Sequence, residues 1–516
     1  MCLSLIIFTF VKILHLNLLN LYTFLQTAPL FRVFLMLMAG GFSGEFFFSS
    51  RSPVLLLAML TTVLAAAFAV RRSGTVQSSM LLFAVYLTGL CTYRISVSDT
   101  CVAESGHYDY SAVVSGGIKR NRGFSTFDMI KTDGGSEHKL RATVRGDVEL
   151  RPGDRLHVRS VINPPEDRHE GRFSYAAYLI RNGYWGTTFL RHGDIESEGC
   201  RYDDLAAFTR FKIYLMRLRS SLLEQLHDRG LKGRDFAAVS AMVFGDKTYL
   251  TTDDREMYSR TGVSHILALS GLHIGIVYAF LTFFLTFIPK VPRFAAIQAA
   301  VWFYVIFAGM SPSLLRAALM ITVYSAGTLM HRDKLSLNSL SLAGTVSVLF
   351  SPQIIFDLCF QLSFMSVFSI ILFYRPLESM LPSRPPLLRK MMQMTAVSVA
   401  AYTGTLPIIL YNFGSMSYCF ILTNLVVIPL TTAVIYLSII SFLPFVGTYV
   451  TTALVCAIHM LNTFVEFMSR ISFISNENMY ISLFTFILTY IVIFSIYLIY
   501  CKLHFSKKVA NISKLD

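Results

Sequence analysis

Long apolar runs separated by short polar segments fill most of this 516-residue chain. About 20 consecutive apolar residues are enough for a helix to cross a bilayer. Before residue 100 we expect three such helices, at 30–48, 53–70 and 80–93. After residue 262 we expect nine more, at 263–288, 294–308, 314–329, 335–350, 354–373, 391–410, 418–440, 443–467 and 481–500. The pattern therefore predicts a polytopic α-helical membrane protein.

A polar segment at about residues 99–203 interrupts the apolar pattern, after an N-terminal membrane region at 1–98. It carries charges of both signs and turn signals, and the runs 141–145 and 155–159 alternate between apolar and polar residues. Alternation with a period of two is typical of strands with one buried face. About 100 residues of short strands fit a small barrel or sandwich, and we favour a barrel because closure removes exposed strand edges. The segment predicts an inserted all-β soluble domain.

Residues 204–232 have the spacing of an amphipathic helix. Arg210, Arg217 and Arg219 lie off the apolar positions, which are Leu205, Phe208, Leu215, Leu218, Leu222 and Leu226. Such a helix can lie in the membrane interface, or it can pack on the barrel or on the helical bundle. Beyond it we expect a helical membrane region at 233–502 and a basic tail at 503–516.

Composition agrees with this organisation. With 54% hydrophobic and 15% charged residues, the chain is too apolar for an ordinary soluble enzyme. The net charge of +14 suits basic loops on an anionic leaflet and equally a polyanionic partner. Short loops rich in Lys and Arg stay cytoplasmic, so Arg71 and Arg72 place the soluble domain outside the cytoplasm, one span later. The eight cysteines include no C-x-x-C pair, and the sequence suggests neither a metal site nor a cofactor.

Polar residues inside the apolar region mark candidate functional positions, because ionisable groups there are costly and usually face a cavity or a partner helix. The segment 264–275 contains His265, Ser270, Gly271, His273 and Gly275. Its glycines allow either a broken helix that exposes backbone groups toward an aqueous path or a close contact between two helices. The residues alone favour neither interpretation.

Three further segments add polar groups to the apolar region. Ser311 and Pro312 predict a helix start, so Arg316 would stand near a positive helix end that suits an anion or phosphate. The alternatives pair Arg316 with an acidic residue such as Asp357 or let it extend to an interface. Asp357 and Gln361 share one helical face, while Pro407, Asn424 and Pro429 indicate kinked or discontinuous helices.

In this order, the motifs resemble those of the ComEC family of DNA-internalisation proteins. The resemblance covers about residues 30–500, and its segments are 245–247, 261–273, 308–317, 360–364, Asn424 with Pro429 and, in the soluble domain, 163–165, 171–179 and 183–187. It implies an oligonucleotide-binding-type (OB-like) barrel and a helical channel for single-stranded DNA. Many family members also carry a metallo-β-lactamase-like nuclease domain, whose zinc-binding His-x-His-x-Asp-His cluster does not occur in this sequence.

These observations define the candidate sites. The expected DNA path consists of His265, Ser270, Gly271, His273, Gly275, Arg316, Asp357, Gln361 and Asn424. In the soluble domain, Lys119, Arg120 and Arg122 are candidates for DNA docking, although such a run is more often a solvated loop. Cys101 and Cys200 flank the domain, and since a closed barrel brings its ends together, we expect a disulfide between them.

The function expected from the sequence is a non-enzymatic DNA-uptake channel of natural transformation, in the bacterial cytoplasmic (inner) membrane. Its partners would be single-stranded DNA, membrane lipids, and a separate DNA receptor, nuclease and cytoplasmic motor or strand-binding protein, with a homo-oligomer left open. The sequence contains no nucleotide-binding P-loop. The alternative is a permease or flippase for another polyanion, such as a lipid-linked sugar phosphate.

Overall fold

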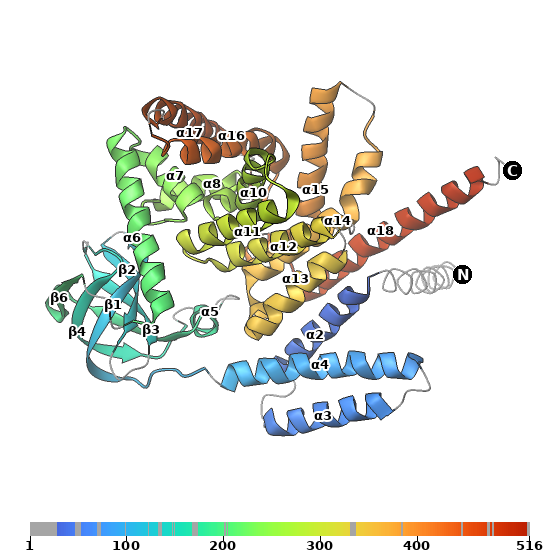
Figure 1. Cartoon of the computed structure of the whole chain (residues 1–516), viewed down its shortest axis with the longest axis horizontal. Coiled ribbons are helices and arrows are strands. Elements are labelled where there is room, and N and C mark those ends of the chain that lie inside the picture. Colours follow the sequence, from blue (N-terminus) through green and yellow to red (C-terminus); the bar gives the residue numbers. More distant parts are fainter. Residues whose placement is uncertain are drawn as a thin grey trace. The chain divides into compact units, whose positions relative to one another are not determined.

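The computed structural model describes residues 28–512 except 47–52, 70–73, 99, 122, 133–136, 147, 149, 168–173, 201–202, 204, 331–336, 383–384, 445–446, 472–474 and 477–478 (Figure 1). The chain divides into two compact units. The first unit consists of Met1–Val97, Met330–Met416 and Glu477–Asp516. The second consists of Ser98–Leu329 and Ser417–Asn476, and it contains the inserted soluble domain.

The first unit is helical. Its elements are α2 (Pro29–Phe46), α3 (Pro53–Ala69), α4 (Gly74–Ser98), α13 (Leu337–Phe350), the 3₁₀ turn η3 (Pro352–Phe356), α14 (Leu358–Ser379), α15 (Pro386–Asn412) and α18 (Leu483–Ile512). Helices α2 and α4 cross at two glycines. A Cβ on Gly40 would lie 2.0 Å from the Tyr86 carbonyl oxygen, and one on Gly89 would lie 2.2 Å from the Leu37 carbonyl oxygen. Only glycine allows two backbones to approach this closely.

The soluble domain is a closed five-stranded barrel. Its strands are β1 (Gly106–Asn121), β2 (Phe124–Lys131), β3 (His138–Arg145), β4 (Asp154–Asn163) and β5 (Tyr184–Leu190), with helix α5 (Tyr175–Arg181) between β4 and β5. The order β1-β2-β3-β5-β4 closes through β1–β4 pairing, and only the β3–β5 pair is parallel. This order is that of an OB-like barrel. A sixth strand, β6 (Ile195–Cys200), pairs with β4, and the 3₁₀ turn η2 (His192–Asp194) precedes it.

Alternation along the strands builds the barrel core, as the sequence pattern predicted. Every second residue of β2, β3 and β4 is buried, among them Phe127, Met129, Leu140, Ala142 and Val158. Residues between them point outward. Strand β1 pairs with β4 along its first half and with β2 along its second half. It bends at Gly116 and Gly117, whose φ angles are +120° and +65°. Such bulges close small barrels.

The remaining helices of the second unit continue from the barrel. They are α6 (Ala207–Asp228), α7 (Gly233–Phe244), α8 (Thr252–Arg260), α9 (Ser264–Leu267), α10 (Gly271–Phe284), α11 (Lys290–Phe307), α12 (Pro312–Leu329), α16 (Phe420–Ile440) and α17 (Gly447–Ser469). Two-residue strands, β7 (Met416–Ser417) and β8 (Ser475–Asn476), flank α16 and α17.

Helix α6 joins the barrel to the helical part of the second unit. Its Ile213 packs with Val113 on the outside of β1, whereas Leu223 and Leu226 belong to the core that α7, α16 and α17 share. Barrel residues also reach the loop after α7, where the Thr248 hydroxyl donates to the Ile118 carbonyl oxygen at 2.7 Å. The expected amphipathic helix is therefore present and packs on both barrel and bundle.

A helix occupies every predicted span, although 263–288 is split into α9 and α10. Among the described residues, six helices are long and apolar enough to cross a membrane: Gly74–Ser98, Leu358–Ser379, Pro386–Asn412, Phe420–Ile440, Gly447–Ser469 and Leu483–Cys501. The apolar helical stretches Leu56–Ala67, Gly271–Phe284 and Leu337–Phe350 are shorter. The chain is thus a polytopic helical membrane protein with an inserted β-barrel.

The predicted disulfide is not formed. Cys101 and Cys200 are both free and exposed. Cys200 pairs with Asp154 at the start of β4, whereas the chain just after Cys101 lies near the end of β4, because Ala103 donates to Trp185 and Gly106 pairs with Ile162. Eight residues of strand, about 26 Å, separate these ends. The expectation failed because the extra strand β6 carries the chain back along β4.

The α2–α4 crossing provides a test of the first unit. We expect Gly89→Val to lower the free energy of unfolding by about 1–3 kcal/mol, since the new side chain overlaps the Leu37 backbone. The measurement is thermal unfolding of the full chain in detergent. The control is Gly327→Val on α12, where a Cβ has nothing within 4 Å. Equal stability of the two variants would contradict the crossing.

Candidate functional site

The helix predicted at 263–288 is broken between α9 and α10. Ala268 ends α9 with an extended backbone, and Ser270 precedes α10 with φ −125° and ψ 175°. The Ser270 hydroxyl lies 3.0 Å from His273 Nδ1, and the Ser270 backbone N–H donates to the same nitrogen at 3.3 Å. Because Nδ1 accepts from a backbone N–H, the neutral ring carries its proton on Nε2. His273 thus caps the break and is fully buried.

The glycines at the start of α10 do not serve a close helix contact. A Cβ on Gly271 would meet only Ala317 Cβ, at an ordinary 3.6 Å, and one on Gly275 would meet nothing within 4 Å. At the α2–α4 crossing, the corresponding distances are near 2 Å. The glycines of 264–275 therefore do not support a close contact between two helices. The alternative, a broken helix, is what the structure has at this segment.

A second break separates α11 from α12. Gly309 and Met310 have φ angles of +94° and +55°. Among the described residues, Met310 alone combines a positive φ with a side chain. Helix α12 then begins at Pro312, and the Ser311 hydroxyl accepts from the Leu314 N–H at 3.4 Å. This confirms the predicted helix start. Arg316 lies in the first turns of α12 and is 2% exposed.

The two breaks lie side by side. The contact between Gly271 and Ala317 joins the first turn of α10 to the first turns of α12. Each helix N-terminus carries about half a positive charge, and Arg316 adds a full one. His273 and Arg316 are each within two residues of this contact. Two helix N-termini and one buried cation therefore converge, an arrangement suited to an anion.

Helix α7 holds both breaks in place through its C-terminal glycine. Gly245 has φ +74°, and a Cβ there would lie 2.5 Å from Leu269 Cδ1 and 2.7 Å from the Ala308 carbonyl oxygen. Leu269 belongs to the first break and Ala308 to the second. Any larger residue would push one of them away.

Arg219 of α6 was expected on the polar side of its helix, but it is buried. It is 6% exposed, donates to the Phe244 carbonyl oxygen at 3.2 Å and pairs with Asp246 at 3.4 Å. A Cβ on Gly309 would lie 3.6 Å from its Nη1 atom. The signal was in the spacing, because Arg219 stands four residues from both Leu215 and Leu223, which are also buried.

Asn424 of α16 is the third buried polar residue predicted to line the path. Helix α16 packs on α10 through Val427, which shares a core with Ile276 and Val277. The Asn424 Oδ1 atom is buried and has no hydrogen-bond partner among the residues that the structure describes. Helix α16 continues through Pro429, so this proline does not divide it.

The remaining predicted path residues are His265, Asp357 and Gln361. His265 is exposed on α9. Asp357 and Gln361 belong to the first unit, where the Asp357 side chain caps α14 by accepting from the Phe360 N–H at 2.7 Å. The Gln361 side chain donates to the Ile355 carbonyl oxygen at 3.0 Å. The two residues therefore have local structural contacts.

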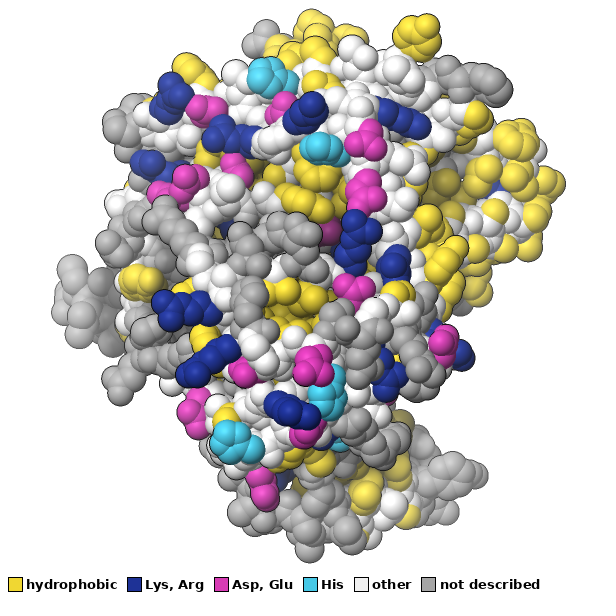
Figure 2. Space-filling view, turned by 90° about the vertical axis from the view of Figure 1, so that its left-hand side faces the viewer, with side chains coloured by type: hydrophobic (Ala, Val, Ile, Leu, Met, Phe, Trp, Pro, Cys, Tyr) yellow, Lys and Arg dark blue, Asp and Glu magenta, His cyan; other side chains and the backbone are white. Residues whose placement is uncertain are grey.

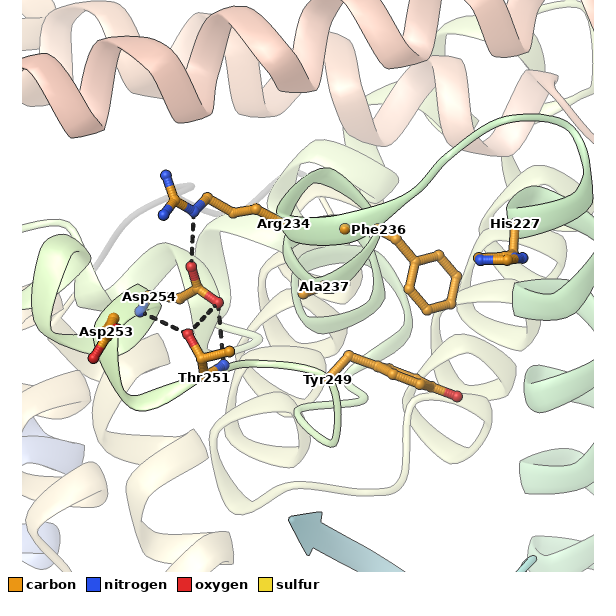
Figure 3. Close-up of a pocket in the computed structure, with 9 residues that line it drawn as sticks. His227, Arg234, Phe236, Ala237, Tyr249, Thr251, Asp253 and Asp254 are labelled. Carbon is orange, nitrogen blue, oxygen red and sulfur yellow. Dashed lines mark hydrogen bonds and ion pairs between the residues drawn. The ribbon is translucent and has the colours of Figure 1, made fainter. Parts of the chain in front are cut away.

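An open pocket of about 630 Å³ lies at the other end of α7 (Figure 3). Arg234 pairs with Asp254 at 2.9 Å and with Glu466 at 2.7 Å, and Thr251 bonds the same Asp254 carboxylate. The rings of Phe236 and Tyr249 line the rest. Arg234 and Asp254 in this pocket thus bind each other. Ala237, the lining residue furthest along α7, stands eight residues, about 12 Å along the chain, before Gly245 at the breaks.

Comparison with known proteins identifies the family. The model of the family described as Competence protein matches residues 242–502, half of the chain. This region contains both breaks, Arg316 and Asn424. The chain belongs to the ComEC family of competence proteins.

Two curated relatives accompany the ComEC-family match. ComE operon protein 3 of Bacillus subtilis (strain 168) is 30% identical over 287 residues, which are 55% of this chain and 35% of the relative. An uncharacterized protein of Aquifex aeolicus (strain VF5) is 27% identical over 232 residues, 44% of this chain and 52% of the relative. The chain thus spans about a third of the length of the Bacillus subtilis relative and about half of the length of the Aquifex aeolicus relative. No solved structure matches.

The buried Arg219–Asp246 pair gives a stability prediction for this ComEC-family chain. We expect Arg219→Met to destabilise it by about 3 kcal/mol, because the Asp246 carboxylate, with its side chain 13% exposed, then loses its cation. The measurement is thermal unfolding of the full chain in detergent. Adding Asp246→Asn should recover part of the loss, whereas Arg210→Met, at an exposed position on the same helix, should change little. A loss equal to that of Arg210→Met would refute the role of the pair.

Proposed function

We propose that this ComEC-family chain carries single-stranded DNA across the cytoplasmic membrane during natural transformation. The observation that supports the proposal is the convergence of the α10 and α12 N-termini with Arg316 at two adjacent helix breaks. Non-helical backbone at membrane depth is tolerated where it is buried in protein or lines a water-filled path. The phosphates of a DNA strand would be attracted by the two helix N-termini and Arg316.

The path would pass the start of α10. Gly271 is exposed and a side chain at Gly275 would have open space, so this face of α10 has room beside it. His273 holds the break in place through its contact with Ser270. Because its ring is buried, it would position the backbone and would not contact the DNA strand itself. Asn424 adds a polar atom on the neighbouring helix α16.

The proposal includes a division of labour. The barrel would lie outside the cytoplasm, in keeping with Arg71 and Arg72, which lie outside the described residues. It would dock the strand before entry. The chain itself would perform no catalytic step, so a separate receptor, nuclease and cytoplasmic motor or strand-binding protein would act with it.

Filling the space beside α10 tests the path. We expect Gly271→Leu to abolish transformation while the protein inserts and accumulates normally, since the glycine has no tight neighbour to displace. His273→Ala should have the same effect on transformation. The measurement is transformation frequency in a complemented deletion strain, with protein quantified in membranes.

The matched control is Gly327→Leu, the same substitution at an open position of α12. Normal transformation with Gly271→Leu would rule out this path. A fall in transformation in proportion to a fall in protein abundance would instead assign the segment to packing.

Removing the Arg316 cation tests whether an anion binds where the N-termini of α10 and α12 converge. We expect Arg316→Ala to lower uptake of labelled DNA about 10- to 100-fold, the range that corresponds to one charged hydrogen bond of about 1.5–3 kcal/mol. Arg316→Lys keeps the charge but loses the planar fork, so it should retain intermediate uptake. Unchanged uptake in Arg316→Ala, or a deletion strain that takes up DNA but loses a lipid-linked sugar phosphate, would favour the flippase alternative.

A further inference from the structure

Helix α7 is a buried rod with the open pocket at one end and the two helix breaks at the other. Its residues from Phe236 to Phe244 are all buried. Its N-terminal end lines the pocket with four residues: Gly233, Arg234, Phe236 and Ala237. At its C-terminal end, Gly245 fits between Leu269 of the first break and Ala308 of the second. A displacement of this helix along its axis would therefore change the space at both ends.

Two side chains from neighbouring helices bind the C-terminal end of α7. The Tyr304 hydroxyl of α11 donates to the Val243 carbonyl oxygen at 2.8 Å, and Arg219 of α6 donates to the Phe244 carbonyl oxygen at 3.2 Å. The last carbonyl groups of a helix have no N–H partner within the helix, so such donors satisfy them. The end of α7 is thus in direct contact with the helix that precedes the second break.

Ion pairs attach the N-terminal end of α7 to α8 and α17. The Arg234 guanidinium pairs with Asp254 of α8 at 2.9 Å and with Glu466 of α17 at 2.7 Å. Glu466 also pairs with Arg470 at 2.6 Å. The side chains of Arg234 and Glu466 are 43% and 37% exposed. Ion pairs that are partly open to water contribute little to stability and are readily exchanged.

A chain of hydrogen bonds forms a second attachment beside these ion pairs. The Asp235 carboxylate accepts from the Asn462 side-chain amide at 2.6 Å and lies 3.2 Å from His459 Nδ1, both on α17. The Asn462 side chain in turn accepts from the Tyr258 hydroxyl of α8 at 2.6 Å. Arg234 and Asp235 with these partners on α8 and α17 are called the latch below. The latch holds α7 against two neighbouring helices.

The pocket leaves room at the end of α7 that carries the latch. It has a volume of about 630 Å³, and a Cβ on Gly233 would have nothing within 4 Å. In Figure 3, the Arg234 side chain extends toward Asp254 and the Phe236 ring extends toward His227. At the other end, the glycine that follows α7 is in contact with both breaks. The direction in which α7 has room to move is therefore toward the pocket.

The charges around this part of the molecule are mixed. Figure 2 shows the side that lies at the left of Figure 1, near α6 and α7, and on it Lys and Arg are interspersed with Asp and Glu. No single sign of charge covers this side. A cation that leaves one carboxylate there has others nearby, so the ion pairs of the latch can be exchanged without leaving a charge without a partner.

We propose that α7 is the gate of the two helix breaks. It moves by about 1–2 Å toward the pocket when the path opens, a size typical of helix shifts between packed neighbours. Arg234 and Asp235 hold it in the closed position. The movement would withdraw Gly245 from Leu269 and Ala308 and widen the place where the α10 and α12 N-termini converge. The proposal rests on the strand transport proposed above for this chain.

A bound small molecule is the other use that a pocket of this size could have. The groups that line it already bind one another. Arg234 pairs with Asp254, and the Phe236 ring packs edge-to-face on Tyr249 at 4.8 Å and on His227 at 5.4 Å. Room for movement of α7 therefore explains the pocket better than a ligand does.

A disulfide across the latch tests the movement. The double variant Asp235→Cys/Asn462→Cys replaces two side chains whose polar atoms are 2.6 Å apart, so a bridge can form between them. We expect oxidation of this variant to lower transformation about tenfold or more, and reduction to restore it, because the bridge fixes α7 against α17. The measurement is transformation frequency in a complemented deletion strain, with bridge formation followed by mass spectrometry of the purified chain.

The two single variants are the controls, and oxidant should not change their transformation. Each comparison is made on protein that is already assembled, before and after oxidation, so a loss of folding does not enter the result. Unchanged transformation with the bridge formed would overturn the gate.

Filling the pocket tests the same movement without altering the latch. Asp253 of α8 is exposed and lines the pocket, so a bulky maleimide on Asp253→Cys would occupy the space that α7 needs. We expect this modification to lower transformation about tenfold or more. The matched control is Glu256→Cys, also exposed on α8 but not part of the pocket lining. The unmodified chain, treated in the same way, controls for its own cysteines.

An equal effect of the maleimide on both cysteine variants, or no effect on either, would overturn the gate. The outcomes also separate the gate from the proposed path. Loss of transformation in Gly271→Leu, combined with full transformation in the bridged and the pocket-filled chains, would overturn the gate and leave the path standing. Loss of transformation in the bridged and pocket-filled chains, combined with normal transformation in Gly271→Leu and Arg316→Ala, would support the movement of α7 and overturn the path.

Discussion

The structure depends on how two helix breaks are satisfied within an apolar bundle. Backbone N–H and C=O groups that leave a helix at membrane depth must find partners in the protein or in a water-filled path. At the first break, Ser270 and His273 cap α10, and at the second, Ser311 caps α12. Gly245 fits between the two breaks, and Arg219 binds the end of the helix that carries it. Polar residues that look misplaced in the sequence are therefore what allows the helices to stop.

The helices and the barrel strands could be predicted from hydrophobic period alone, because each element follows from neighbours in the sequence. A helix lies in every expected apolar run, and alternation in 141–145 and 155–159 appears as β3 and β4. Pairing could not be predicted in the same way. The parallel contact of β3 with β5 and the addition of β6 to β4 join residues far apart in the chain, and the second of these separates Cys101 from Cys200.

The candidate site was predictable where chemistry and local geometry coincide. Ser311 and Pro312 start a helix by their own side chains, so Arg316 was placed correctly near its N-terminus. Asp357 and Gln361 share a helical face, yet that geometry is equally satisfied by capping α14 and the preceding turn. Glycine is the least informative residue in sequence, since Gly89 contacts a backbone and Gly275 borders open space. Only packing distinguishes these uses.

Helix α6 gives the barrel a physical connection to the breaks. Lys212 lies near Asp128 of the barrel, and seven residues later, about 10.5 Å along the helix, Arg219 binds Phe244 and lies beside Gly309. Arg219 anchors the same helix to the C-terminal end of α7 and lies beside Gly309 of the loop that precedes α12. Because a packed helix moves as a unit, the barrel and the α11–α12 break are both in contact with one rigid element. The buried cation of α6 therefore joins the barrel to the place where α12 begins.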